Sequence, residues 1–321
     1  MYEVHGNCND SLVEIYTEMD AEIVEQRVLS PFGIDIKNFR NPEVWRAVTV
    51  EFIATALLVF LSISTVLACL QGEFASPKSL IALVHVFILW LCVMAAGPAS
   101  GGHLNPCITF TCMLTGLTSP VRSMLYILAQ SAGSILGSWL VAAIVSPKVC
   151  QAYSLAGCVL KPRTHNSQDE SVQAGMEISR AFLSEFCFSF ALLFFAFMVV
   201  LDPKSFRVSG PILSPILVGL MIGMLIFIST GFTGKDSYTG AGMNPARCFG
   251  PAAVMEEDNI WYGQWVFWAG PFAAGLVVAL IYHIIPPQHV EIYRNQLDIF
   301  TQVRSSFKRR KLFNIDSREA H

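Results

Sequence analysis

An internal repeat constrains the fold of this chain more than any other feature of its sequence. Each half contains an apolar segment with one glutamate, Glu51 or Glu185, and an Asn-Pro pair farther along, Asn105-Pro106 or Asn244-Pro245. The spacing from the glutamate to the asparagine is nearly the same in both halves. Because each half has three apolar segments, the second copy must enter the membrane from the side opposite to the first. The pattern predicts an inverted repeat, in which broken helices from opposite faces meet near the membrane midplane.

Six apolar segments are long enough to cross a bilayer, which takes about 20 residues of helix. We place them at about 46–70, 79–97, 121–145, 178–201, 211–231 and 261–286. The chain of 321 residues is 53% hydrophobic and 14% charged with a mean hydropathy of +0.51, a composition typical of membrane proteins. Two glycine pairs favour close helix crossings in lipid, namely Gly133 with Gly137 and Gly219 with Gly223. We predict an all-α membrane protein with six transmembrane helices and two re-entrant half-helices.

Each Asn-Pro pair has the features of a helix start, because Asn is a preferred N-cap and Pro suits the first helical position. The apolar stretches that follow, 108–117 and 249–254, are too short to span a bilayer and would form half-helices. Two opposed helix N-termini would disfavour cations at the centre, and the amides of Asn105 and Asn244 could donate to a neutral solute. The alternative is that both asparagines act only as caps. Their occurrence in an inverted repeat favours the pore.

Four ionisable residues lie within or beside these segments. Arg247 either pairs at the outer interface with the acidic run 256–258 or is held by backbone carbonyls and faces the pore, where it would repel cations. Glu51 and Glu185 could relay protons. We favour a structural role, in which each carboxylate accepts hydrogen bonds from the irregular backbone before its half-helix. The position of His85 alone favours the protein core over the pore.

The rest of the chain consists of polar tails and loops. We assign residues 1–43 and 287–321 to tails and 44–286 to one channel domain, made of repeats at about 44–145 and 178–286. The positive-inside rule makes both tails cytoplasmic. That side carries most basic residues: Arg40, Arg46, Arg122, Lys204, Arg207 and the cluster at 308–311. Residues 1–40 lack the apolar run of a cleavable signal peptide.

Composition and motifs exclude several functions. The net charge of −3 and the lack of a basic domain argue against nucleic-acid binding. The nine cysteines include no C-x-x-C pair, so we expect no metal site. A disulfide between Cys150 and Cys158, which share an outer loop, is less favoured than free thiols. The run 231–236 has the wrong spacing for a P-loop, and neither G-x-S-x-G nor H-E-x-x-H occurs. We therefore predict no enzyme activity and no cofactor.

The paired boxes, the two glutamates and the stretch 265–272 resemble the major intrinsic proteins, or aquaporins, over about residues 44–286. Cys248 after Arg247, Cys107 where most aquaporins have Ala, and the outer-loop motif 153–158 are similar to the X-intrinsic subfamily. The resemblance implies a homotetramer with one pore per subunit, whose central boxes are Asn105, Pro106, Cys107 and Asn244, Pro245, Ala246. It also implies a constriction of four residues, which counting from the boxes places at His85, Phe232, Ala241 and Arg247. His85 would replace an aliphatic residue of the subfamily and make this constriction more polar.

Our hypothesis is a passive, bidirectional channel that conducts small uncharged solutes and excludes ions and protons. We expect hydrogen peroxide and water first, then glycerol, urea and boric acid, with the bulk of His85 and Phe232 opposing the larger solutes. Two rivals are a secondary transporter, which is also built from inverted repeats, and a structural or signalling membrane protein without conduction. We expect a lipid bilayer, the plasma membrane, as the surroundings and no nucleic acid as a partner.

Overall fold

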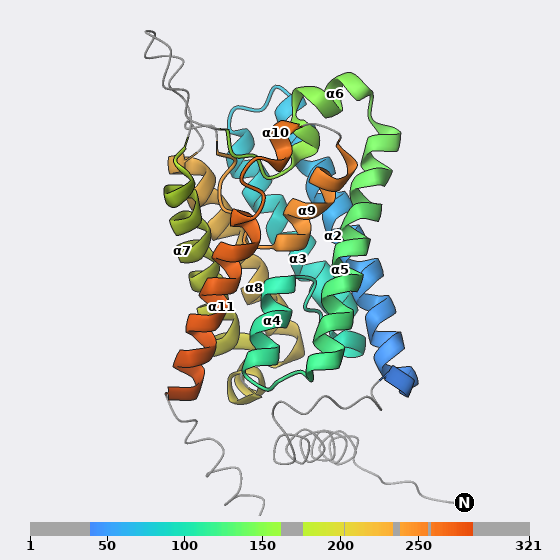
Figure 1. Cartoon of the computed structure of the whole chain (residues 1–321), viewed down its shortest axis with the longest axis vertical. Helices are drawn as coiled ribbons and strands as arrows, with labels where there is room; N and C mark the ends of the chain where they lie inside the picture. Colours follow the sequence, from blue (N-terminus) through green and yellow to red (C-terminus); the bar gives the residue numbers. More distant parts are fainter. Residues whose placement is uncertain (1–38, 162–175, 202, 234–237, 256–257, 285–321) are drawn as a thin grey trace, which may run out of the picture. The chain divides into compact units, whose positions relative to one another are not determined.

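The computed structural model describes residues 39–161, 176–201, 203–233, 238–255 and 258–284 (Figure 1). The chain divides into two compact units, residues 1–279 and 280–321. The described part of the second unit is the end of one helix, residues 280–284. The two tails expected at 1–43 and 287–321 therefore lie almost wholly outside the described residues.

Six long helices account for most of the described chain. They are α2 (Pro42–Gln71), α3 (Pro77–Ser100), α5 (Pro120–Ile144), α7 (Ile178–Ala196), α8 (Pro203–Thr233) and α11 (Val266–Ile284). Among the described residues these six, with α8 counted from Gly210 to Gly231, are long and apolar enough to cross a membrane. The described part of the chain contains no sheet, and its one extended pairing is a bridge between Leu160 and Tyr238. The predicted all-α class and its six spans are confirmed.

Two short helices follow the Asn-Pro pairs: α4 (Pro106–Leu114) and α9 (Pro245–Val254). Figure 1 shows α9 above α4, with α5 running beside both of them. Smaller elements lie in the connections: α6 (Pro147–Ala152), the 3-10 turn η2 (Ser154–Ala156), the π-helical turn η4 (Phe197–Leu201) and α10 (Asp258–Trp261). The two half-helices thus occupy the interior of the first unit.

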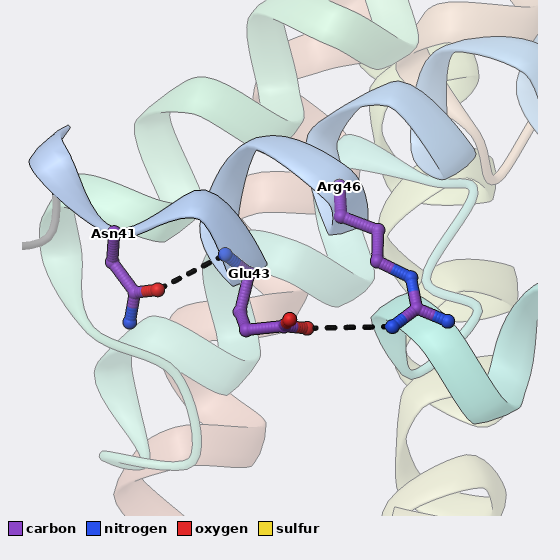
Figure 2. A network of polar contacts seen from close by, with 3 residues as sticks. All are labelled: Asn41, Glu43 and Arg46. Carbon is purple, nitrogen blue, oxygen red and sulfur yellow. Dashed lines mark hydrogen bonds and ion pairs between the residues drawn. The ribbon is translucent and has the colours of Figure 1, made fainter.

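Most of these helices begin at a proline preceded by Asn or Ser. The fixed φ of proline suits the first helical position, and the preceding side chain can accept a free backbone N–H. At the start of α2, Asn41 accepts from the N–H of Glu43 at 3.0 Å (Figure 2). The carboxylate of Glu43 also lies 3.6 Å from Arg46, but both side chains are well exposed. An ion pair so exposed adds little, so the cap is the stronger local signal.

Close helix crossings rest on the two glycine pairs. A Cβ on Gly133 or Gly137 of α5 would overlap a backbone oxygen of α2, that of Phe52 or Ala56. Gly219 of α8 approaches α3 in the same way. Backbones can come this near only where no side chain intervenes. The close helix crossings that the glycine pairs favoured are present between α5 and α2 and between α8 and α3.

The connection between α7 and α8 differs from the prediction. The fourth apolar segment was expected to be one span over 178–201, but the α-helix ends at Ala196 and continues as a π-helical turn. The fifth apolar segment was placed at about 211–231, yet α8 begins earlier, at Pro203, and breaks at Gly210. Gly210 has a φ of 70° and precedes Pro211. A residue without a Cβ tolerates that conformation, and proline cannot continue the incoming helix, so this pair makes the break.

Candidate functional site

A cavity of about 530 Å³ runs through the first unit. Its lining includes Lys78 and Lys161 near the α6 side and Val200 and Leu201 in the turn after α7. The asparagines of both boxes line its middle. Because α7 crosses the unit from one side to the other (Figure 1), the cavity extends between the two sides. Both halves of the sequence repeat therefore contribute to the lining of this cavity, which we call the passage.

The two Asn-Pro boxes hold each other across this passage. Asn105 Nδ2 donates to the carbonyl of Met243 at 2.9 Å, and Asn244 Nδ2 donates to the carbonyl of Leu104, also at 2.9 Å. Each asparagine oxygen meanwhile caps its own half-helix: Asn105 Oδ1 accepts from the N–H of Cys107 at 2.8 Å. A primary amide has two N–H groups, so one on each asparagine is left for a molecule in the cavity. Each asparagine side chain therefore caps its own half-helix, hydrogen-bonds to the opposite box and can donate to a solute.

Glu51 organises the chain just before the first half-helix. Its carboxylate is fully buried and accepts from the N–H groups of His103 at 2.9 Å and Leu104 at 2.8 Å. It also accepts from Ser100 Oγ at 2.6 Å and from Gln130 Nε2 at 2.8 Å. Leu104 has a φ of 51°, a conformation that non-glycine residues rarely adopt. The carboxylate thus satisfies N–H groups of an irregular segment that lipid could not satisfy.

Glu185 does the same for the second half. It accepts from the N–H groups of Gly242 at 2.7 Å and Met243 at 3.1 Å, and from the Tyr238 hydroxyl at 2.7 Å. Met243, like Leu104, has a positive φ, of 53°. Neither Glu51 nor Glu185 lines the cavity. This is the structural arrangement described by the sequence-based hypothesis, and it leaves neither carboxylate facing the passage.

Three of the four residues assigned to the constriction line the cavity: His85, Ala241 and Arg247. The side chain of the fourth, Phe232, lies outside the described residues. The α8 side chains that line the cavity nearest this position are Ile226 and Thr230. Thr230 Oγ1 donates to the carbonyl of Ile226 at 2.7 Å, which leaves its lone pairs free to accept. Thr230 is therefore a cavity-lining residue that counting from the box had missed.

His85 is held by two hydrogen bonds, one at each ring nitrogen. Nδ1 lies 2.7 Å from the carbonyl oxygen of Ile81, one turn earlier in α3. Nε2 lies 2.7 Å from Ser62 Oγ on α2. The ring is half-buried and lines the cavity. Position in the sequence had favoured the core for His85, and the geometry instead places its ring at the passage wall.

The guanidinium of Arg247 contacts sulfur among the described residues. Its Nη1 donates to Cys158 Sγ at 3.5 Å, and the backbone carbonyls expected to hold it stay a prediction. Cys158 is disulfide-bonded to Cys248, the residue after Arg247. The expectation of free thiols is therefore confirmed for Cys150, which is buried and free, and wrong for Cys158, while the less favoured bond between these two cysteines is not formed. The disulfide fixes the segment after η2 directly over the start of α9.

The outer segment at 157–160 is held by further contacts. Gln264 Nε2 donates to the carbonyl of Cys158 at 3.4 Å, and the N–H of Val159 donates to Thr239 Oγ1 at 3.0 Å. Leu160 pairs with Tyr238, which also binds Glu185. Cys158 therefore reaches the cavity on a loop that is anchored on both sides.

Cys107, the unusual residue of the first box, points away from the passage. Its thiol is fully buried and donates to the carbonyl of Pro271 in α11 at 3.1 Å. Cys107, at the third position of the first box, thus takes part in the packing of α4 against α11. Among the described residues, no group of three His, Cys, Asp or Glu side chains is arranged to hold a metal ion.

Comparison with known proteins places this geometry in a family. The family model described as "Major intrinsic protein" matches residues 38–282. A probable aquaporin TIP3-2 of Arabidopsis thaliana is 33% identical over 266 residues, which cover 78% of this chain and 89% of that protein. A PIP-type aquaporin of Atriplex canescens is 31% identical over 258 residues, covering 79% and 84%.

Solved structures agree on the fold. The chain superposes on the X-ray structure of an aquaglyceroporin from Plasmodium falciparum with a TM-score of 0.59 and 17% sequence identity. That match covers 76% of this chain and 98% of the other. With six apolar helices and relatives of this kind, the chain is an integral membrane protein. It belongs to the family of the major intrinsic proteins, the aquaporins.

Proposed function

We propose that this protein is a passive, bidirectional channel for small uncharged solutes. The observation that carries the proposal is the crossed pair of asparagines, each with one amide N–H left over in a cavity that extends between the two sides. A solute oxygen could accept from both amides in turn and move on, because neither bond is stronger than those that water offers. Membership of the aquaporin family supports the same proposal.

Ion exclusion follows from the charges along the passage. Two half-helices direct their positive N-terminal ends at its middle. The cationic side chains of Arg247, Lys78 and Lys161 also line it, while the described lining contains no Asp or Glu. A cation would leave its hydration shell and meet the positive ends of both half-helices and the charge of Arg247. A neutral solute pays no such electrostatic cost.

The constriction that we propose consists of His85, Phe232, Ala241 and Arg247. Thr230 and Cys158 also line the cavity, with Cys158 beside the guanidinium, and the bulk of His85 and Phe232 opposes the larger solutes. Hydrogen peroxide and water remain the first expected solutes, and glycerol, urea and boric acid follow. Arg247 offers donors and Thr230 offers an acceptor to their oxygen and N–H groups.

Finer assignments stay proposals. The Cys-containing boxes and loop motif favour the X-intrinsic subfamily, and family resemblance favours a homotetramer with one pore per subunit. We keep the channel domain at 44–286 with cytoplasmic tails at 1–43 and 287–321. We also keep the plasma membrane as the expected location.

Stopped-flow light scattering of proteoliposomes tests the function. In gradients of glycerol and urea, vesicles with the wild-type protein should shrink and re-swell faster than empty vesicles. In a gradient of sorbitol they should shrink faster but should not re-swell. Ala241→Phe should abolish the difference by filling the constriction. Leu220→Phe, at an exposed position of α8, is the matched control and should conduct normally. If neither water nor any solute crosses faster than in empty vesicles, the channel proposal fails.

The strongest rival, a secondary transporter, needs carboxylates that bind a coupling ion in the passage. Glu51 and Glu185 are the intramembrane carboxylates within the described spans, and both are occupied by backbone and side-chain donors. Neither reaches the cavity lining. The contacts of these two residues therefore favour the channel.

A further inference from the structure

We propose that Ser62 sets the chemistry of the constriction by occupying the one acceptor nitrogen of His85, so that the ring meets a passing solute with carbon alone. Ser62 is a positioning residue in this proposal, because it acts on the solute through His85. The inference rests on the proposed function, since it concerns how the channel selects its solutes.

The first step is the tautomer of His85. Nδ1 lies 2.7 Å from the carbonyl oxygen of Ile81. A carbonyl oxygen can only accept, so Nδ1 must carry a proton and donate. In the neutral ring the other nitrogen, Nε2, then has no proton and can only accept. The helix that carries His85 thus fixes its tautomer.

The second step is the partner of that acceptor. Ser62 Oγ lies 2.7 Å from Nε2, and its hydroxyl is the donor because Nε2 has none to give. Ser62 belongs to α2 and is 2% exposed, so little water competes for this bond. Both residues border the cavity. A donor from one helix and an acceptor from another therefore use up both nitrogens of the ring.

What remains of His85 at the passage is its carbon edge. The ring fills space, but it neither donates to a solute nor accepts from one. The polar side of the constriction is left to Arg247 and to the acceptor of Thr230. The constriction then has a polar side and a carbon side, which suits solutes that combine oxygen or N–H groups with C–H groups, such as glycerol. This replaces the expectation that His85 makes the constriction more polar.

Removing the hydroxyl of Ser62 should leave Nε2 of His85 without its hydrogen-bond donor. In Ser62→Ala the ring keeps its bond to Ile81, and Nε2 becomes an unprotected acceptor beside the cavity. Ser62→Thr keeps a hydroxyl at the same place and is the conservative control. Diethyl pyrocarbonate, a small neutral reagent, acylates unprotonated imidazole nitrogens and is not repelled by the cations that line the passage. Its product on His85 can be located by peptide mass spectrometry.

The experiment compares acylation of His85 in proteoliposomes that contain wild type, Ser62→Ala or Ser62→Thr. We expect Ser62→Ala to react about tenfold faster than the other two, the factor that corresponds to about 1.4 kcal/mol and hence to one hydrogen bond. Acylation should also reduce glycerol flux through Ser62→Ala, and the double variant Ser62→Ala/His85→Ala should be insensitive. Equal rates in wild type and Ser62→Ala, or a Ser62→Thr variant as reactive as Ser62→Ala, would overturn the proposal.

A measurement on the wild type guards against a variant that does not fold. Solid-state NMR of the protein labelled with ¹⁵N-histidine should show His85 protonated at Nδ1, and a proton on Nε2 instead would overturn the proposal. Acylation and NMR need no conduction. If wild-type vesicles conduct nothing, the proposed function fails, while the labelling pattern still decides the role of Ser62.

Discussion

Replacing Glu51 by Gln tests whether the intramembrane carboxylates are structural. The carboxylate of Glu51 has four donors, with His103 N–H on one oxygen and Leu104 N–H on the other. An amide keeps one oxygen, so in either orientation its NH₂ group faces one of these backbone N–H groups. A buried N–H left without an acceptor costs about 1–3 kcal/mol, and each remaining bond weakens when its acceptor loses its charge. Relief from burying a charge offsets part of the loss, and we expect a net destabilisation of about 2–4 kcal/mol.

Thermal unfolding of the purified protein in detergent, followed by tryptophan fluorescence, measures this effect. The expected loss corresponds to a Tm lower by roughly 5–15 °C. Glu73→Gln, an exposed site between α2 and α3, is the control and should leave the Tm unchanged. A Glu51→Gln protein that is as stable as wild type but has lost solute uptake driven by a proton gradient would refute the structural interpretation. It would point to a proton relay.

Three further substitutions address the passage and its packing. Arg247→Ala should admit sorbitol and raise cation leak into vesicles loaded with a sodium-sensitive dye, because it removes a repulsion of about 4 kcal/mol for a cation at 4 Å; an unchanged leak would mean that the half-helix dipoles suffice. Cys158→Ser should lower stability by as much as about 4 kcal/mol, and a reductant should lower the Tm of wild type but not of this variant. Gly133→Ala should cost about 1–3 kcal/mol by forcing α5 away from α2. Gly231→Ala in α8, with open space around its Cβ, is the control and should be neutral or slightly stabilising; equal Tm values for the two glycine variants would contradict the account of the crossing.

Residues that lie close together in the sequence were sufficient to predict the six spans, the two half-helices and the Asn-Pro boxes. The Asn-Pro pairs contain both the cap and the first helical residue, so the starts of α4 and α9 follow from neighbouring residues alone. Long apolar runs locate the spans because lipid requires each backbone group to be bonded within its own segment. The position of each glutamate relative to its box suggested its role, because only an acceptor could satisfy the irregular backbone there.

The parts that could not be predicted depend on contacts between distant segments. Cys158 and Cys248 are 90 residues apart, and their pairing needs the outer loop to fold back over α9. Counting to Phe232 assumed a fixed register between α8 and the second box. Thr230 of α8 lines the cavity, and the count alone did not identify it. The chemistry of His85 depends on Ser62 in another helix, which no spacing within α3 reveals.

The central claim is that solutes cross this protein passively through the passage between Asn105 and Asn244. The most direct test is the flux of radiolabelled glycerol into proteoliposomes, measured with and without imposed proton and sodium gradients. We predict an inward and outward flux that is proportional to the glycerol gradient, unaffected by either ion gradient, and absent in Ala241→Phe. Accumulation of glycerol above its external concentration when an ion gradient is applied would contradict the account, because a passive channel can only dissipate a gradient.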